Sequence, residues 1–84
     1  MEYKIVWSVK AAKQMEGLDR SIAKRIYEKV DQLHHSPERY VEKLVRYPYY
    51  RLRFGDFRLI LDIQTQILSV LILKVGHRSN IYER

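Results

Sequence analysis

The chain has 84 residues, of which 46% are hydrophobic and 31% are charged. These values are typical of a small globular protein and exclude a second domain, a disordered chain and a fibrous protein. The sequence contains no cysteine, which excludes a disulfide framework and a thiolate zinc site. We therefore expect one domain over residues 1–84, and the longest apolar run, residues 67–75, is too short to cross a membrane.

The formal net charge is +6, and most of it lies in the C-terminal part of the chain. Residues 46–84 contain seven Lys and Arg against three Asp and Glu, whereas residues 1–45 contain nine against seven. A positive surface attracts polyanions, chiefly nucleic acid, although an acidic protein partner would suit it equally well. The N-terminal residues do not have the pattern of a signal peptide, so we expect the protein in the cytoplasm.

The N-terminal part of the sequence predicts a strand followed by two helices. Residues 3–9 are rich in β-branched and aromatic side chains, which favours a strand, and Ser8 is suited to cap a helix over residues 9–17. Asp19 is the predicted N-cap of a longer helix, in which apolar residues recur at spacings of three and four. These apolar residues are Leu18, Ile22, Ile26, Val30 and Leu33. We expect the two helices to form a helical hairpin.

The C-terminal part predicts strands. Pro37 ends the second helix, and residues 38–48 are expected to form a loop with some helical character. Residues 49–63 have the pattern of a tight β-hairpin, and residues 67–75 that of a buried strand. The predicted fold class is α+β in the order β-α-α-β-β-β. We expect a mostly antiparallel four-stranded sheet with the helical hairpin packed on one face.

The hairpin places like charges opposite each other. With a two-residue turn at Gly55 and Asp56, Arg53 lies directly opposite Arg58, and Arg51 lies on the same face. The other face is apolar and is expected to pack against the helices. It consists of Tyr50, Leu52, Phe54, Phe57, Leu59 and Leu61. The arginines therefore belong to the uncovered face of the sheet.

Two explanations of this arginine face remain open. Like charges across an antiparallel pair are destabilising, which is understandable if an anion lies between them. Guanidinium groups match phosphate oxygens, and Tyr49 beside them is suited to stack on an unpaired base. Alternatively the arginines are merely solvated, and Asp62 neutralises one of them.

Histidines provide the other candidates for chemistry. His77 follows the last strand next to Arg78, and this pair could transfer a proton and stabilise a developing negative charge, although it could equally be an ordinary surface loop. His34 and His35 are adjacent, so they do not share a helix face, and we expect no metal site there. Four acidic residues are assigned to a solvated face: Glu28, Asp31, Glu38 and Glu42.

Two segments carry a resemblance to a known family. The segment KLVRYPYYRLRFGDFRLIL at residues 43–61 and the segment LKVGHRSNIY at residues 73–82, in this order of elements, resemble the RelE/ParE toxin superfamily of prokaryotic toxin–antitoxin systems. The sequence is more similar to the RelE branch, which cuts mRNA in the ribosomal A site, than to the ParE branch, which inhibits DNA gyrase. The resemblance implies a microbial-ribonuclease-like fold.

The resemblance also implies a reaction and partners. The ribose 2′-hydroxyl attacks the neighbouring phosphate and gives a cyclic phosphate and a free 5′-hydroxyl, without metal or other cofactor. The implied partners are a cognate antitoxin protein, the 70S ribosome and mRNA. Two alternatives stay open: a gyrase inhibitor without enzymatic activity, and an inactive basic binding domain.

Particular residues match the family's functional positions. The resemblance implies that Arg51 and Arg53 contact the scissile phosphate, that Arg58 and Arg78 stabilise charge in the transition state, and that Tyr82 stacks on a base. Four further residues are expected to bind substrate: Tyr49, Lys43, Arg46 and Lys74.

This sequence departs from the family at two positions that bear on which residue accepts the proton. The best-known members have lysines at the positions that match Arg51 and Arg53. A guanidinium group stays protonated and cannot easily act as a base. His77 is therefore the preferred proton-transfer group, and we count it among the catalytic candidates.

Overall fold

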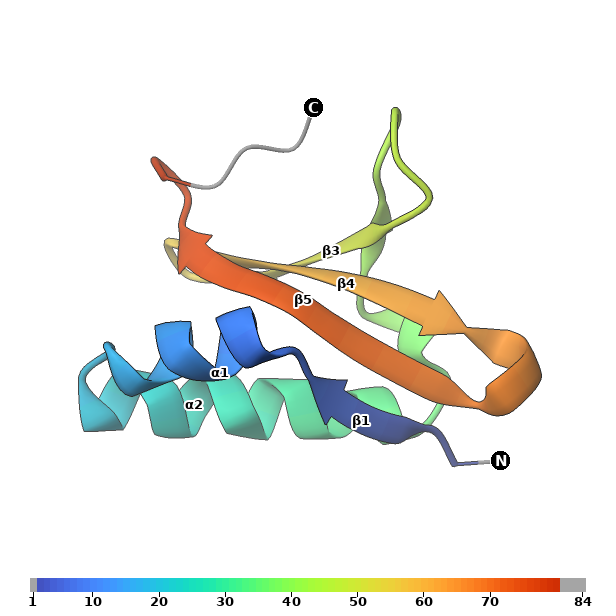
Figure 1. Ribbon diagram of the computed structural model, residues 1–84, viewed down its shortest axis with the longest axis horizontal. Helices are drawn as coiled ribbons and strands as arrows, with labels where there is room; N and C mark the ends of the chain where they lie inside the picture. The colour runs from blue at the N-terminus through green and yellow to red at the C-terminus, as the bar shows by residue number, and fades with distance from the viewer. Residues whose placement is uncertain (1, 81–84) are drawn as a thin grey trace.

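The computed structural model describes residues 2–80, and in this part of the chain two helices pack against one face of a five-stranded sheet (Figure 1). The strands follow the order β1-β5-β4-β3-β2 across the sheet. They are β1 (Lys4–Trp7), β2 (Glu42–Lys43), β3 (Tyr50–Phe54), β4 (Phe57–Gln64) and β5 (Ser69–His77). The predicted α+β class is confirmed.

The sheet has one strand more than predicted and is mostly antiparallel, as expected. β1 runs parallel to β5, whereas the other neighbouring strands are antiparallel. β2 lies in the segment that was expected to be a loop, because Glu42 and Lys43 pair with Arg51 and Tyr50 at the outer edge of β3. The expected helical character of this segment is limited to a 3-10 turn over Pro37–Arg39. The consequence is that Glu42 lies beside the arginine-bearing strand.

The two predicted helices are present as α1 (Val9–Glu16) and α2 (Arg20–Asp31). Ser8 caps α1 as predicted: its hydroxyl oxygen accepts a hydrogen bond from the amide of Ala11 at 3.0 Å and donates one to the carbonyl of Leu73 at 2.8 Å. Ser8 thus fixes the start of α1 against β5. No helix in residues 2–80 is long and apolar enough to cross a membrane.

The core lies between the helices and the sheet. The buried residues of the second helical segment, Ile26, Val30 and Leu33, pack with apolar residues from the sheet. These sheet residues are Leu52, Leu59, Leu61, Val70, Ile72 and Val75. The apolar face predicted for the hairpin is confirmed, since its three aromatic members also pack against this core.

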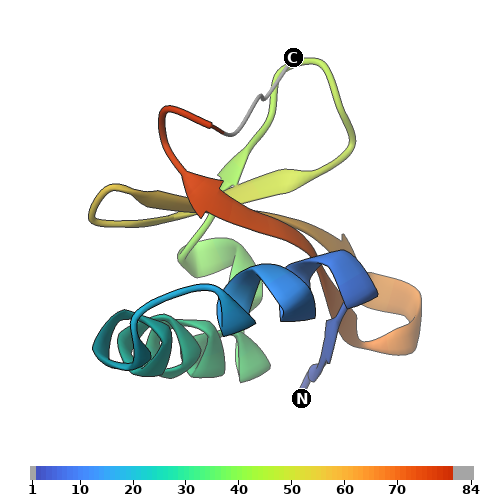
Figure 2. The same ribbon diagram turned by 60° about the vertical axis from the view of Figure 1, so that its left-hand side comes forward.

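The opposite face of the sheet is only partly open. Ile60 and Leu44 are buried although they do not belong to the core on the helical side. Leu44 donates a backbone hydrogen bond to Tyr49 at 3.0 Å and so closes the base of the loop over residues 45–48. This loop rises from the sheet on the side away from the helices (Figures 1 and 2). The arginine face is therefore bordered by a raised loop at the β2–β3 side.

The described core predicts that substitution by alanine lowers stability much more at a buried aliphatic residue than at an exposed one. Leu59 is fully buried, so Leu59→Ala should lower the free energy of unfolding by about 2–5 kcal/mol. The control is Ile67→Ala, whose side chain is 69% exposed and should change stability by less than about 0.5 kcal/mol. Urea unfolding followed by circular dichroism measures both. Equal losses for the two variants would contradict the described core.

Candidate active site

The turn between β3 and β4 sets the position of the arginines. Gly55 has φ +54°, a left-handed conformation that glycine adopts without steric cost, and it allows the tight turn. The predicted register is confirmed: Arg53 pairs with Arg58, and Arg51 pairs with Ile60. Because Leu52 faces the core, these arginines lie on the face of the sheet away from the helices.

Glu42 on β2 is the carboxylate that holds two of these arginines. Its Oε1 atom accepts hydrogen bonds from Arg51 Nη2 at 2.8 Å and Arg51 Nε at 3.1 Å. The same oxygen lies 3.3 Å from Arg53 Nε. The side chain of Arg51 is only 22% exposed, whereas those of Arg53 and Glu42 are 58% and 54% exposed. A ligand arriving from solvent can therefore reach this cluster.

The arginines change the acidity of Glu42. The hydrogen bond from Arg51 and the positive charge of Arg53 hold the pKa of the Glu42 carboxyl below its ordinary value. The positive charge of Arg58 lowers this pKa further. Glu42 is therefore ionised at neutral pH and is a negative charge among three positive ones.

Glu42 was missed by the sequence reading, which assigned it to a solvated face. The alternative explanation, with solvated arginines, had Asp62 neutralise one of them, and this contact is not found among the described residues. Asp62 accepts a hydrogen bond from Gln64 at 3.1 Å, and no ion pair to an arginine is found for it within residues 2–80. The signal that could have identified Glu42 is its place in a short segment that can pair with β3 as an edge strand.

Arg58 is held by the backbone of its own turn. Its Nη1 donates hydrogen bonds to the carbonyl oxygens of Gly55 and Phe57, each at 2.9 Å. These contacts fix the guanidinium beside Arg53 and offset part of the repulsion, because carbonyl oxygens carry partial negative charge. Arg58 is thus positioned before any ligand binds.

Arg78 joins the same turn from the C-terminal side. Its backbone amide donates to the carbonyl of Asp56 at 2.7 Å, and its Nε lies 3.8 Å from Asp56 Oδ1. The structure therefore brings Arg78 to the hairpin turn that carries Arg58, as the sequence reading required.

His77 is not brought together with the arginines. In the pairing of β4 with β5, Arg58 lies opposite Gly76, whereas His77 lies opposite Phe57 and packs edge-on against its ring, with the centroids 5.7 Å apart. Phe57 belongs to the face toward the helices, so His77 points to that side too. Its Nδ1 is 2.8 Å from the hydroxyl of Ser79. The geometry does not support His77 as the base at the arginine face.

The four candidates for substrate binding surround the hairpin. Lys43 lies over the ring of Tyr50, with its Nζ 5.2 Å from the centroid. Tyr49 is half-buried at the base of the raised loop, and Arg46 is exposed within that loop. Lys74 pairs with Ile60 across β4 and β5. Tyr82, the predicted stacking residue, lies outside the described residues.

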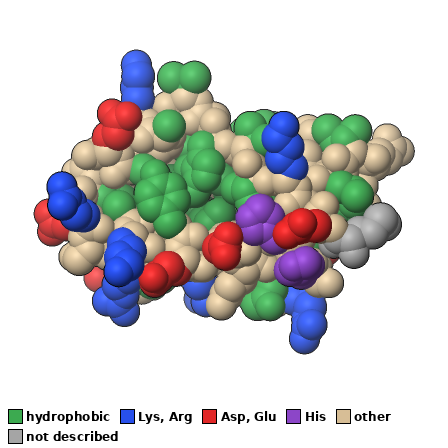
Figure 3. Space-filling view, turned by 90° about the horizontal axis from the view of Figure 1, so that it is seen from below, with side chains coloured by type: hydrophobic (Ala, Val, Ile, Leu, Met, Phe, Trp, Pro, Cys, Tyr) green, Lys and Arg blue, Asp and Glu red, His purple; other side chains and the backbone are tan. Residues whose placement is uncertain are grey.

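The adjacent histidines form ordinary surface pairs. His34 Nε2 lies 3.3 Å from Asp31, and His35 Nε2 lies 3.9 Å from Glu2. Figure 3 shows two histidines beside acidic side chains at the edge of an apolar area, on the face seen from below. No group of three residues able to hold a metal is found in residues 2–80.

Comparisons with known proteins identify the family to which this chain belongs. A family model described as "ParE toxin of type II toxin-antitoxin system, parDE" matches residues 5–82. The chain belongs to the RelE/ParE toxin superfamily. It is a toxin of a type II toxin–antitoxin system. None of the curated protein sequences compared with the toxin matches it.

Solved structures support the same assignment. The toxin is similar to a chain of the RelBE2 toxin–antitoxin complex from Mycobacterium tuberculosis, with 26% identity, a TM-score of 0.86, and coverage of 93% of the toxin and 100% of that chain. It is also similar to a chain of the archaeal RelE–RelB complex from Pyrococcus horikoshii, with 27% identity, a TM-score of 0.81, and coverage of 96% and 100%. The ParDE system of P. aeruginosa shares the fold at 15% identity and a TM-score of 0.68, over 90% of the toxin and 96% of that chain.

The contact between Glu42 and Arg51 predicts a measurable titration. The hydrogen bond from Arg51 lowers the pKa of Glu42, so Arg51→Ala should raise this pKa toward its ordinary value. Arg58→Ala is the control, because Arg58 lowers this pKa through its charge alone and to a smaller extent. Carbon NMR of the Glu42 carboxyl group measures both. An unchanged pKa in Arg51→Ala would contradict the contact.

The same shift predicts how this ion pair depends on pH. Because the pKa of Glu42 is lower in the folded protein, its contribution to stability is present above the pKa of the unfolded chain. This contribution disappears as pH falls through the pKa of the folded protein.

Proposed function

We propose that this toxin is a metal-independent endoribonuclease that cuts mRNA in the ribosomal A site and so blocks translation. The observation that supports the proposal is a row of arginines along the hairpin. Arg51 and Arg53 contact Glu42, Arg58 lies opposite Arg53, and Arg78 contacts Asp56 at the turn. Relatives with 26% and 27% identity are RelE-type toxins, which favours the ribonuclease branch over others.

In this proposal the arginines bind and stabilise the reacting phosphate. Arg53 and Arg58 face each other across the hairpin and offer planar donors to the phosphate oxygens. Attack by the 2′-hydroxyl adds negative charge to this group, and fixed cations lower the energy of that state without having to reorganise. Arg78, next to the turn, adds further positive charge.

Glu42 is the proposed proton acceptor in place of His77. It is the carboxylate in contact with Arg51 and Arg53, and a phosphate bound there would add negative charge next to it. That charge opposes the effect of Arg51 and Arg53 and raises the pKa of Glu42, so that the carboxylate becomes a stronger base when substrate binds. The 2′-hydroxyl gives its proton to Glu42, and the departing 5′-oxygen takes a proton from water.

We further propose a cognate antitoxin as partner, with the ribosome and mRNA as target and the cytoplasm as the compartment. The similar structures are toxin chains in complexes with antitoxins, and the net charge of +6 favours an acidic antitoxin segment. An antitoxin carboxylate over Arg53 would block the site that the phosphate needs. Tyr49, Lys43, Arg46, Lys74 and Tyr82 are proposed to contact the RNA around the reacting phosphate.

A second candidate function is inhibition of DNA gyrase by binding, without enzymatic activity. It is favoured by one observation, the match of residues 5–82 to a family model that carries the ParE name. A supercoiling assay with purified gyrase separates the two. Inhibition of supercoiling by the toxin, together with intact mRNA, would support this candidate.

The first test is direct cleavage. Cell-free translation with added toxin should give new mRNA ends within the A-site codon, which primer extension maps. Arg58→Ala should lower the cleavage rate by about 100-fold or more, because it removes a fixed donor from the reacting phosphate. Intact mRNA and normal protein synthesis with the unmodified toxin would contradict the proposed function.

A second test identifies the proton acceptor. Glu42→Gln keeps the shape of the side chain but removes its basicity, so cleavage should fall by about 100- to 10,000-fold. Because this variant also removes a negative charge from the arginines, its affinity for RNA should stay the same or increase. The control is His77→Gln, which should retain most of the activity. The reverse result would return the role of the base to His77.

A further inference from the structure

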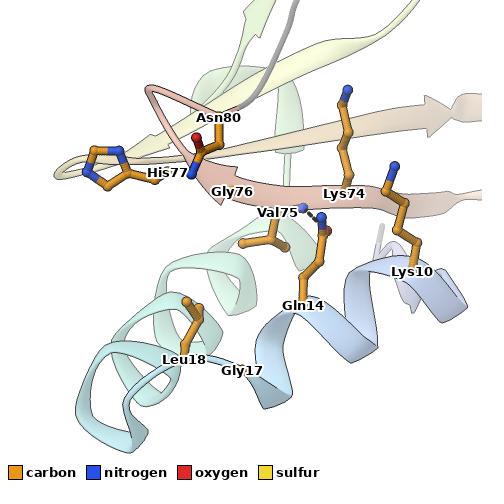
Figure 4. Close-up of a pocket in the computed structure, with 9 residues that line it drawn as sticks. All are labelled: Lys10, Gln14, Gly17, Leu18, Lys74, Val75, Gly76, His77 and Asn80. Carbon is orange, nitrogen blue, oxygen red and sulfur yellow. Dashed lines mark hydrogen bonds between the residues drawn. The ribbon is translucent and has the colours of Figure 1, made fainter.

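The edge of β5 carries a pocket from which the proposed cleavage site uses only Lys74. β1 ends at Trp7. The next residue, Ser8, still lies beside β5, because its amide donates a hydrogen bond to the carbonyl of Ile72 at 2.9 Å. Beyond this point β5 continues to His77 next to α1. The space between α1 and this part of β5 forms an open pocket of about 410 Å³ (Figure 4).

The pocket presents hydrogen-bond donors. Lys10 from α1 and Lys74 from β5 extend to the same side of it (Figure 4). The side-chain oxygen of Gln14 accepts a hydrogen bond from the amide of Val75 at 2.6 Å, so Gln14 has its amide nitrogen left as a donor. None of the described residues that line the pocket carries a carboxylate. Two ammonium groups and an amide donor suit an anionic ligand.

The pocket is continuous with the arginine face at a glycine. Gly76 lines the pocket and is also the residue of β5 opposite Arg58 on β4. Neighbouring strands lie about 4.8 Å apart, and Gly76 itself adds no side chain between Arg58 and the pocket. A chain of phosphates bound at Arg58 can therefore continue over β5 at this position.

We propose that this pocket binds the backbone phosphate of a nucleotide next to the scissile one in single-stranded RNA. The inference rests on the proposed function, because the arginine face supplies the first phosphate and the pocket the neighbouring one. Lys10 is the cation that α1 contributes to this binding, and the sequence analysis did not select it. The pocket lengthens the RNA path from the hairpin across the sheet to α1.

The test compares two lysines of the same helix. Lys10 and Lys13 are both exposed residues of α1, but only Lys10 is among the residues that line the pocket. Fluorescence anisotropy measures binding of each variant to a short 2′-O-methyl oligouridine, which the toxin cannot cut because the 2′-hydroxyl is blocked. The measurement is repeated at several salt concentrations.

Lys10→Ala should weaken binding several-fold and lower the slope of log affinity against log salt by about 0.7, the value for one lost phosphate contact on a single strand. Lys13→Ala should leave both quantities close to those of the unmodified toxin. Equal behaviour of the two variants, whether both bind weakly or both bind normally, would overturn the proposal.

This result is independent of whether the toxin cuts RNA. If the unmodified toxin leaves ribosome-bound mRNA intact while Lys10→Ala alone weakens oligouridine binding, the proposed cleavage fails and the RNA-binding pocket stands. If the toxin cuts mRNA and the two variants bind alike, the cleavage stands and the pocket proposal is overturned.

Discussion

Repulsion between Arg53 and Arg58 is the constraint on which the arrangement of the site depends. The two-residue turn at Gly55 and Asp56 places Arg53 and Arg58 directly opposite each other. The structure offsets this repulsion with two kinds of partner: the carboxylate of Glu42, which lies beside Arg53, and the carbonyl oxygens of the turn, which accept hydrogen bonds from Arg58. These partners keep the guanidinium groups in place but leave Arg53 and Glu42 accessible to solvent. A phosphate can then enter a site that is already arranged.

The buried face of the hairpin stabilises this arrangement. The same strands that carry arginines outward carry Leu52 and Leu59 inward, where both are buried against the helical layer. Burial of such residues stabilises the register, because a slip by one residue would place the leucines in solvent and the arginines in the core. The proposed binding surface and the buried core therefore occupy alternate residues of the same two strands.

The sequence predicted what depends on short-range periodicity and missed what depends on pairing between distant segments. Alternation along the hairpin was enough to place Arg53 opposite Arg58, and spacing along α2 was enough to find its buried face. The two-residue strand that holds Glu42 has no periodicity of its own, and its position follows only from pairing with β3. The face of His77 depends on the register between β4 and β5, which has an irregularity at Ile60. Neither the position of Glu42 nor the face on which His77 lies could be predicted from the local sequence pattern.

The central claim is that a bound substrate phosphate opposes the effect of the arginines on the pKa of Glu42. The most direct measurement is the pKa of the Glu42 carboxyl by carbon NMR, with and without a saturating 2′-O-methyl oligouridine. The account predicts that this pKa, which is below its ordinary value in the free toxin, rises when the oligonucleotide binds. A pKa that stays unchanged or falls on binding would show that the phosphate does not reach the arginines around Glu42 and would contradict the account.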